Sequence, residues 1–548
     1  MVKLIDDYLN AGEQRSFEKA GIKLPQFSQE KVRRTTEKNP VWVHFGGGNL
    51  FRCFHAMIAQ QLLNKGKLKS GIIVAETYDE EVIKDIYHAF QDRILSVTMK
   101  SDGSLEKELV ASVAQSVYYN LANEEGWDYL TDVFENPSLQ LATFSITEKG
   151  YAIRGIDGKL TALAEKDIVA GPEKPQTNMG AIAHLLYARY QRNQAPIAMV
   201  STDNFSENGA KLQQAVLTIA KGWLQYGTVE QGFIDYLQDR KKVTFPWSMI
   251  DRITPNPAAS IAKKLTAAGF EDAQIVHTKK HTNIAPFGNT EETHYLVIED
   301  DFPNGRPPLE EAGVLLTNRE TVNDADQMKV TACLNPLHTA LAIFGNLLGY
   351  QFIWEEVADN DLLGLVKNLG YREALPVVKD PGILHPKPFI DLLLNQRLPN
   401  RNIPDTPQRI ATDTSQKLSI RYGVTIQHYL DDPQRSVDDL EFIPLVLAGW
   451  CRYLLGVDDQ GQAFTLSPDP LLKPLQKKLA EVHLGFHGDV HQYLQPILSN
   501  KEIFGNDLDA IGLGTKVEHY FKALIKGKNS VRETVKNTVA EKGIAFAK

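Results

Sequence analysis

The stretch Val41-Trp42-Val43-His44-Phe45-Gly46-Gly47-Gly48-Asn49 joins a short apolar run to three consecutive glycines. Residues 41–45 are predicted to form a buried strand, because apolar side chains dominate them and a turn signal follows. Beyond the glycines, apolar residues recur at helical spacing, at Leu50, Phe51, Phe54, Met57, Ile58, Leu62 and Leu63. The apolar run at residues 71–75 predicts a second strand. This order of strand, glycine turn, helix and strand is typical of the βαβ unit of a dinucleotide-binding sheet.

The glycines at 46–48 are the feature that points to a nucleotide, although a plain tight turn is the alternative interpretation. A pyrophosphate needs close approach of the backbone and a helix N-terminus, which the helix beginning near Asn49 supplies. Arg52 lies one turn into that helix, where we expect it to reach a phosphate. Glu76 ends the second strand, where a carboxylate accepts ribose hydroxyls and repels a 2′-phosphate, so NAD is favoured over NADP. The acids at positions 79 and 80 are alternatives for this role.

The remaining pattern divides the chain into an α/β part and a helical part. Further strands are predicted at 141–146, 196–201, 274–277 and 295–298. The segment 301–308 is rich in Pro and Gly and is expected to be a linker or a surface loop. The first forty residues are polar and helix-prone, and beyond about residue 320 the pattern is mostly helical. We therefore predict an α/β N-terminal Rossmann-type domain over 1–318 and a mainly α-helical C-terminal domain over 319–548.

Composition limits the class of protein. A chain of 548 residues is too long for one core, and its net charge of −9 argues against a nucleic-acid binder. The three cysteines, at positions 53, 333 and 451, are too few and too widely spaced for a disulfide framework or a zinc site. The N-terminus does not resemble a signal peptide and no apolar run is long enough to cross a membrane. A cytoplasmic enzyme, with neither nucleic acid nor membrane as a partner, is the expectation.

Seven motifs recur in an order that matches a known family. They are His44–Phe54, Thr147–Tyr151, Ser201–Asn204 with Asn208–Gly209, Met249–Pro255, Val297–Phe302 with Gly305–Pro308, Lys329 with Asn335–His338, and Arg409–Lys417. Together they resemble the polyol-specific long-chain (mannitol) dehydrogenase family, and the Gly-Asn-aromatic-x-Arg form is most similar to its uronate reductase branch. The resemblance implies cofactor contacts at Phe45, Gly46, Gly47, Gly48, Asn49, Leu50, Arg52, Glu76, Glu148 and Asp251. It covers roughly residues 41–420.

The resemblance also implies the catalytic groups. Oxidation of a secondary alcohol needs a base and stabilisation of the developing alkoxide. The family's lysine base corresponds to Lys329, its two alkoxide-binding asparagines to Asn204 and Asn335, and its substrate histidine to His338. Five residues separate the lysine from the second asparagine here, where the family usually has four. Either a local bulge absorbs the extra residue or Lys329 is displaced, since one residue turns a helix by about 100°.

Local sequence suggests how these groups are held. Pro336 favours a helix start, so Asn335 is expected to be its N-cap, with His338 in the first turn. Arg409 and Lys417 are eight residues apart, close to two helical turns, and are expected to bind a substrate carboxylate. Asp326, three residues before the lysine, is a candidate to tune the base.

The function these features predict is the reversible reduction of a keto-sugar acid at C2 with NAD(H). Fructuronate to mannonate is favoured and tagaturonate to altronate is next. The alternatives are a polyol 2-dehydrogenase acting on a neutral sugar, such as mannitol, and a non-catalytic sensor of NAD or sugar, which only the shifted lysine spacing supports. No metal is expected, because glycines interrupt the histidine series at 483, 487 and 491. A monomer or a small homo-oligomer is expected.

Overall fold

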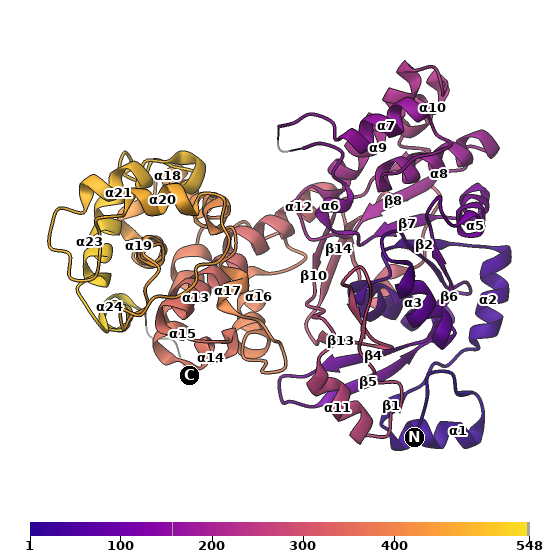
Figure 1. The fold of residues 1–548 in the computed structure, drawn as a ribbon, viewed down its shortest axis with the longest axis horizontal. Coiled ribbons are helices and arrows are strands. Elements are labelled where there is room, and N and C mark those ends of the chain that lie inside the picture. Colours follow the sequence, from indigo (N-terminus) through magenta and orange to yellow (C-terminus); the bar gives the residue numbers. More distant parts are fainter. Residues whose placement is uncertain (156, 545–548) are drawn as a thin grey trace. The chain divides into compact units, whose positions relative to one another are not determined.

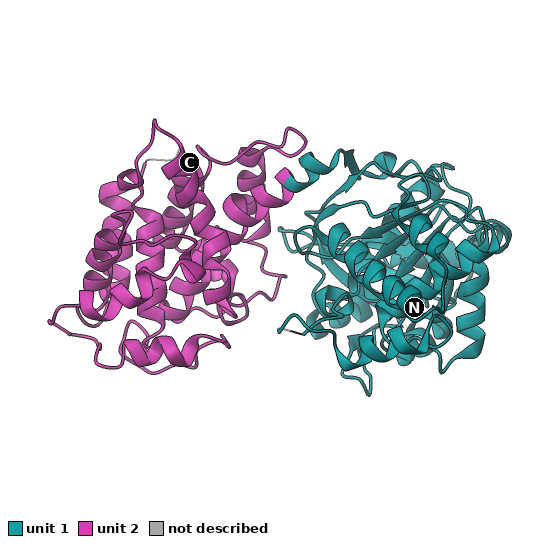
Figure 2. Ribbon diagram, turned by 90° about the horizontal axis from the view of Figure 1, so that it is seen from above, with its two compact units in different colours: residues 1–323 teal, residues 324–548 magenta. Residues whose placement is uncertain are grey.

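The computed structural model describes residues 1–155 and 157–544, in two compact units (Figures 1 and 2). The first unit ends at Asn323 and the second begins at Asp324. The division lies inside the continuous helix α12 (Arg319–Met328), five residues beyond the predicted boundary at 318/319. The breaker-rich segment 301–308 is a surface loop of the first unit, since Asn304 Nδ2 donates to Leu139 O at 2.8 Å.

A six-stranded parallel sheet forms the centre of the first unit. Its strands, in spatial order, are β6 (Val113–Tyr118), β3 (Ile72–Glu76), β2 (Trp42–Phe45), β7 (Leu141–Phe144), β8 (Ile197–Ser201) and β9 (Val243–Thr244). With β2 counted as the first strand, this is the order 3-2-1-4-5-6 of a Rossmann sheet. The order reverses between β2 and β7, and ligands bind such sheets at the carboxyl ends of the strands at this point.

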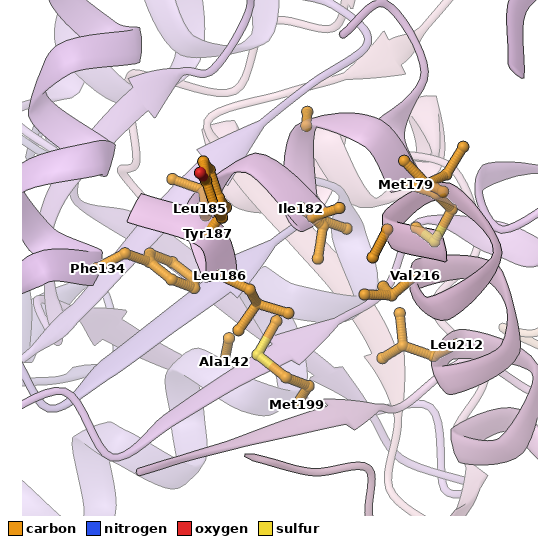
Figure 3. Close-up of a cluster of buried hydrophobic side chains, with 14 of the residues drawn as sticks. Phe134, Ala142, Met179, Ile182, Leu185, Leu186, Tyr187, Met199, Leu212 and Val216 are labelled. Atoms are coloured by element: carbon orange, nitrogen blue, oxygen red, sulfur yellow. The ribbon is translucent and has the colours of Figure 1, made fainter. Parts of the chain in front are cut away.

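Helices cover both faces of this sheet and enclose two cores. One core lies between the sheet and α5, α8, α9 and α10, and Figure 3 shows Leu186 of α8 and Val216 of α9 near Ala142 of β7 and Met199 of β8. The helices of this unit are α1 (Ala11–Lys19), α2 (Gln29–Lys38), η1 (Phe51–His55), α3 (Ala56–Asn64), α4 (Glu80–Val82), η2 (Ile83–Tyr87), η3 (His88–Phe90), α5 (Glu124–Glu135), α6 (Thr147–Gly150), α7 (Ala162–Ala170), α8 (Asn178–Arg192), α9 (Asn208–Gln225), α10 (Gln231–Gln238), α11 (Ala259–Ala267) and η4 (Leu309–Ala312).

Smaller sheets extend the first unit beyond the Rossmann core. Their strands are β1 (Ile22–Lys23), β5 (Leu105–Val110), β4 (Ile94–Met99) and β13 (Phe287–Glu291) in one sheet, β10 (Ser248–Asp251), β14 (Tyr295–Glu299) and β15 (Leu315–Thr317) in a second, and β11 (Val276–His277) with β12 (Asn283–Ile284) in a hairpin. The N-terminal segment packs into a third core beside the first of these sheets, through Val2, Leu4 and Phe17. The sequence pattern did not predict that sheet, because some of its strands are far apart in the chain, as in the pairing of Phe287 with Leu95.

The second unit is helical, as predicted. Its elements are η5 (Lys329–Cys333), α13 (Asn335–Leu348), α14 (Ile353–Ala358), α15 (Asn360–Lys367), η6 (Asn368–Ala374), α16 (Pro386–Leu392), η7 (Leu393–Arg397), α17 (Pro407–Ile410), η8 (Thr414–Gln416), η9 (Ser419–Gly423), α18 (Val424–Asp431), η10 (Val437–Asp439), α19 (Phe442–Tyr453), α20 (Leu472–Lys478), α21 (His491–Leu498), α22 (Lys501–Phe504), α23 (Gly514–Leu524) and α24 (Ser530–Lys542). The apolar helices α13 and α19 pack together and are almost entirely buried.

Candidate active site

A pocket of about 390 Å³ opens at the carboxyl edge of the Rossmann sheet, where the strand order reverses. Its lining comes from the turns after β2, β7, β8 and β10 and from the β11–β12 hairpin, and comprises Gly48, Asn49, Leu50, Ser145, Thr147, Asp203, Thr254, Asn256, His281, Thr282, Asn283 and Ile284. Both its position and its volume are typical of a ligand site in an open α/β sheet.

The glycine turn shapes one wall of this pocket. Gly46 has φ +108°, and a Cβ there would lie 2.3 Å from Ser145 O, so only glycine fits between β2 and β7. Gly48, in contrast, has no heavy atom within 4 Å of the place a Cβ would take. The helix begins at Asn49, so its N-terminus and an open backbone meet at the pocket. This arrangement fits a pyrophosphate, which is attracted by the helix dipole and by free backbone N–H groups.

Glu76, the last residue of β3, fixes the conformation of the glycine turn through hydrogen bonds. Its carboxylate is buried and accepts hydrogen bonds from Gly47 N at 2.8 Å, from Tyr78 N at 2.8 Å and from Asp79 N at 3.2 Å. Tyr87 OH donates to Gly47 O at 2.8 Å, which fixes the turn from the other side. The predicted ribose acceptor therefore also sets the conformation of the phosphate-binding turn.

Two of the expected cofactor residues lie elsewhere. The side chain of Phe45 is fully buried and stacks on Phe144 with ring centroids 4.9 Å apart, so it belongs to the core. The side chain of Arg52 is also fully buried, and its guanidinium hydrogen-bonds Ala285 O and Asn49 Oδ1. The expectation that Arg52 reaches a phosphate is not met in this structure, because its donors face the protein interior.

The turn after β7 is strained and is held by a buried acid. Thr147 has φ +63°, which is unfavourable for a β-branched residue. Asp203 accepts from Ile146 N and Thr147 N, each at 2.9 Å, and from Tyr151 OH at 2.6 Å. Burial raises the pKa of Asp203, against the effect of these hydrogen bonds. Strain maintained in this way is common at ligand sites, and sequence reasoning missed Asp203 although it precedes the predicted Asn204.

The other predicted residues of the first unit lie near the pocket but do not line it. Asn204 is exposed and follows Asp203, which does line it. Glu148 is exposed and forms a salt bridge with Lys211 at 3.1 Å. Asp251 is buried at the end of β10, while Thr254, three residues on, reaches the pocket.

In the second unit, Lys329 begins a π-helical segment, η5. Leu334 N donates to Lys329 O at 3.1 Å, a five-residue step that is one residue wider than an α-helical step. The extra residue between Lys329 and the asparagine is thus absorbed by a local bulge, which was the first of the two possibilities considered. Lys329 is buried, and its Nζ lies 3.5 Å from the equally buried Asp326 Oδ1, which places the predicted tuning acid beside the predicted base.

Asn335 and His338 begin α13. The helix starts at Asn335 itself and Leu334 is the N-cap, so the expectation that Asn335 caps the helix is wrong by one residue. His338 lies in the first turn, as expected. Its Nε2 is 3.1 Å from Oδ2 of Asp405, an acid that no local signal indicated.

Arg409 contacts the same acid. Its Nε and Nη2 lie 2.9 and 2.6 Å from Asp405 Oδ1, and its side chain is 64% exposed. Burial alone would raise the pKa of Asp405, but His338 and Arg409 together hold it below its usual value. The carboxylate therefore neutralises Arg409, one of the two cations expected to bind substrate.

Lys417 does not share a helix with Arg409. The chain leaves α17 after Ile410, passes Asp413 with φ +54° and forms the short turn η8, so the expected two-turn helical spacing is wrong. Lys417 Nζ donates to Thr412 O at 2.5 Å. Burial lowers the pKa of Lys417, and the charges of Arg421 and Arg409 act in the same direction, whereas Asp413 and Asp469 act against it. Arg421 was not predicted, although it follows Lys417 by four residues.

The described residues offer neither a cluster of metal-binding side chains nor a helix that could cross a membrane. Within residues 1–155 and 157–544, no three His, Cys, Asp or Glu side chains gather in a way that would hold a metal ion. No helix in that part of the chain combines the length and apolarity needed to cross a membrane.

Both units match models of known protein families. A model described as the mannitol dehydrogenase Rossmann domain matches residues 41–311, and one described as the mannitol dehydrogenase C-terminal domain matches residues 322–525. This chain belongs to the mannitol dehydrogenase family. The resemblance inferred from the motifs is confirmed, as is the combination of a Rossmann-type domain with a helical domain, and the protein is an oxidoreductase of this family.

One curated relative and two solved structures are similar to this protein over nearly the whole chain. A D-mannonate oxidoreductase of Thermotoga maritima is 48% identical over 529 residues, which cover 96% of this chain and 97% of the relative. A D-sorbitol dehydrogenase structure in substrate-free form has a TM-score of 0.78 at 25% identity, covering 94% of this chain and 98% of its own. The ternary complex of Pseudomonas fluorescens mannitol 2-dehydrogenase with NAD and D-mannitol has a TM-score of 0.70 at 24% identity, covering 95% and 97%.

Proposed function

We propose that this protein is an NAD-dependent reductase that interconverts a hexuronate and the corresponding aldonate at C2, with fructuronate and mannonate as the favoured pair. The observation that carries the proposal is the 48% identity to a D-mannonate oxidoreductase over almost the full length of both chains. Tagaturonate and altronate are the next candidate pair, since they differ from the first only in configuration. The protein is proposed to act in the cytoplasm, in keeping with its buried, unpaired cysteines.

The cofactor fits the residues at the edge of the Rossmann sheet. Gly46–Gly48 and the helix N-terminus at Asn49 would hold the pyrophosphate, and Glu76 would face the adenosine ribose. The negative charge of Glu76 opposes a 2′-phosphate and favours NAD over NADP. When bound, NADH supplies the hydride that reduces the C2 carbonyl.

The remaining residues move a proton and stabilise charge. In the reduction, Lys329 Nζ gives a proton to the C2 oxygen, and in the oxidation it takes that proton back. Asn204 and Asn335 donate hydrogen bonds to the same oxygen as negative charge develops on it. His338, oriented by Asp405, contacts the substrate hydroxyls. The π-helical segment removes the one argument for a non-catalytic sensor, because it accommodates the shifted lysine spacing.

A direct assay tests the proposal. Loss of NADH absorbance is followed with fructuronate, tagaturonate and fructose in parallel, at matched concentrations. The highest kcat/KM is expected for fructuronate. A preference for fructose would instead identify a polyol 2-dehydrogenase, the alternative that the structural similarity to a D-sorbitol dehydrogenase favours. No turnover of any of the three would contradict both assignments.

A further inference from the structure

Arg421 lies next to the helix turn that holds the predicted substrate groups. It belongs to η9, which packs against η5 and α13. Its Nη1 hydrogen-bonds Thr339 Oγ1, and that hydroxyl donates in turn to Asn335 O at 2.7 Å. Thr339 follows His338 directly and lies one helical turn from Asn335, on the same side of α13. The guanidinium is thus one side chain away from Asn335.

The backbone around Arg421 is anchored on both sides. Tyr422 OH donates to Pro336 O at 2.6 Å, and Thr425 Oγ1 donates to Thr331 O at 3.2 Å. A Cβ on Gly423 would lie 2.2 Å from Phe504 O, so α22 approaches the segment as closely as glycine allows. These contacts hold η9 and the start of α18 against the segments that carry Lys329 and Asn335. They therefore also hold the backbone of Arg421 in place beside those segments.

The positive charge of Arg421 has no negative partner among the described residues. Its one hydrogen bond there goes to the neutral hydroxyl of Thr339. Burial lowers its pKa to about 10, with no carboxylate acting against this effect. Two fully buried arginines of this protein, Arg189 and Arg452, bind five and three backbone carbonyls. The half-buried Arg421 therefore keeps donors, and among the described residues its charge faces no carboxylate, which suits it to bind an anion.

We propose that Arg421 binds the carboxylate of the sugar acid and so selects an anionic substrate over a neutral one. This inference rests on the proposed function. In an open-chain hexuronate, C2 and the carboxylate carbon are four bonds apart, roughly 5 Å with bonds near 1.5 Å. That distance matches the helical turn of about 5.4 Å between Asn335, which receives the C2 oxygen, and Thr339, which holds Arg421.

The two predicted carboxylate ligands then take different roles. Arg409 is already neutralised by Asp405 and acts through that acid on His338, which makes it a positioning residue. Lys417 lies four residues before Arg421, and the charge of Arg421 contributes to the lowered pKa of Lys417. Arg421, which has no carboxylate partner within residues 1–155 and 157–544, is the cation proposed to bind the substrate carboxylate.

The test compares two substrates that differ at C6 alone, fructuronate with a carboxylate and fructose with a hydroxymethyl group. Arg421→Gln in the full-length protein is expected to lower kcat/KM for fructuronate about 100-fold, mainly by raising KM. The kcat/KM for fructose should change little. Arg421→Lys should lie between the two. Arg409→Gln should lower both activities alike. The control is Arg435→Gln, a partly buried arginine of the same unit that is paired with Asp432.

A binding measurement separates this inference from the proposed function. The thermal stabilisation of wild type by mannonate, compared with mannitol, reports carboxylate binding without turnover. Arg421→Gln is expected to lose the mannonate effect, and this result supports the inference even if wild type reduces no uronate, which would contradict the proposed function instead. Equal stabilisation of wild type and variant by mannonate, or an equal loss of kcat/KM for fructuronate and fructose in Arg421→Gln, would overturn the role of Arg421.

Discussion

At the scale of single residues, Glu76 combines two tasks in one carboxylate. It accepts three backbone N–H groups that set the glycine turn, and it keeps a negative charge at the end of β3. The charge, rather than the turn, is the basis of the proposed preference for NAD. Glutamine removes the charge but keeps one acceptor oxygen, whereas Gly47 N binds one oxygen of Glu76 and Tyr78 N and Asp79 N bind the other. The thermal midpoint of the variant therefore reports the effect on the turn, and the ratio between the cofactors reports the effect of the charge.

The first prediction is therefore a change of cofactor preference. Wild type should have a higher kcat/KM with NADH than with NADPH, and Glu76→Gln should reduce the ratio by about tenfold, since a 2′-phosphate then meets no negative charge. The kinetics of both cofactors and the thermal midpoint of the variant are measured together. A wild-type preference for NADPH would show that Glu76 does not face the ribose.

The second prediction concerns Asn335, whose proposed role is to stabilise charge in the transition state. Asn335→Ala should lower kcat on the order of a hundredfold, the usual cost of one lost oxyanion donor. Asn360→Ala is a matched control, because Asn360 is also the first residue of a helix but is exposed at the start of α15. If Asn335→Ala lowers the thermal midpoint but leaves kcat near normal, the asparagine serves only the helix start.

At the scale of elements, the π-helical segment η5 explains how an insertion is tolerated. One additional residue in a regular helix would rotate Lys329 by about 100° relative to Asn335. The wider turn closed by Leu334 N and Lys329 O accommodates that residue locally. The side chains of the flanking helices therefore keep the directions they would have without the extra residue. Such single-turn bulges are frequent at functional sites.

The third prediction follows from this geometry. Deletion of Val330, a partly exposed residue inside η5, should convert the wide turn to an α-helical one and leave a folded protein with measurable turnover. Insertion of a further alanine after Val330 should abolish turnover, because one more residue rotates Lys329 by about 100° relative to Asn335. Circular dichroism and kcat distinguish the two variants. Complete inactivity of a well-folded deletion variant would mean that the bulge itself positions Lys329.

The fourth prediction concerns the start of α19, where Glu373 is a buried cap. Its carboxylate accepts from the N–H groups of Glu441, Phe442 and Ile443 at 2.6–2.8 Å, yet burial raises its pKa to about 7. A carboxyl group with a folded-state pKa above its unfolded value of about 4.5 favours folding less as pH rises between these two values.

Wild type should therefore lose stability on the order of 1–3 kcal/mol between about pH 5 and pH 8, relative to Glu373→Gln, which cannot ionise. Urea denaturation of both proteins across this range is the measurement. Parallel stability profiles would show that the three backbone donors outweigh burial and that Glu373 is ionised throughout.

At the scale of the whole molecule, the proposed cofactor and substrate residues belong to separate units with separate cores. The nucleotide pocket is built entirely from residues of the first unit, whereas Lys329, Asn335 and Arg421 belong to the second. A change in the second unit should therefore leave the nucleotide pocket unchanged, even when it stops the reaction.

The fifth prediction uses this separation. Lys329→Ala should abolish nearly all turnover while the dissociation constant for NADH, measured by fluorescence, stays within a small factor of wild type. Partial recovery of turnover by added small amines would identify proton transfer as the missing step. Wild-type-like activity of Lys329→Ala would show that another group is the base.

The sequence by itself determined the elements that depend on local pattern. The strand, glycine turn and helix at residues 41–55 and the helical second half could be predicted because side-chain periodicity and glycine conformation act over a few residues. The family motifs added the resemblance to the mannitol dehydrogenase family. The start of α13 was predicted to within one residue, since Pro336 restricts its own backbone and that of its neighbour.

Only the tertiary structure decided which charged groups meet. Arg52 turns inward to Ala285, 233 residues away, and Arg421 reaches Thr339 across 82 residues. Asp405 pairs with both His338 and Arg409, whereas Arg421 hydrogen-bonds the neutral hydroxyl of Thr339. Local pattern cannot specify such pairings, because a charge is neutralised by whichever residue the folded chain brings within a few ångströms, at any distance along the sequence.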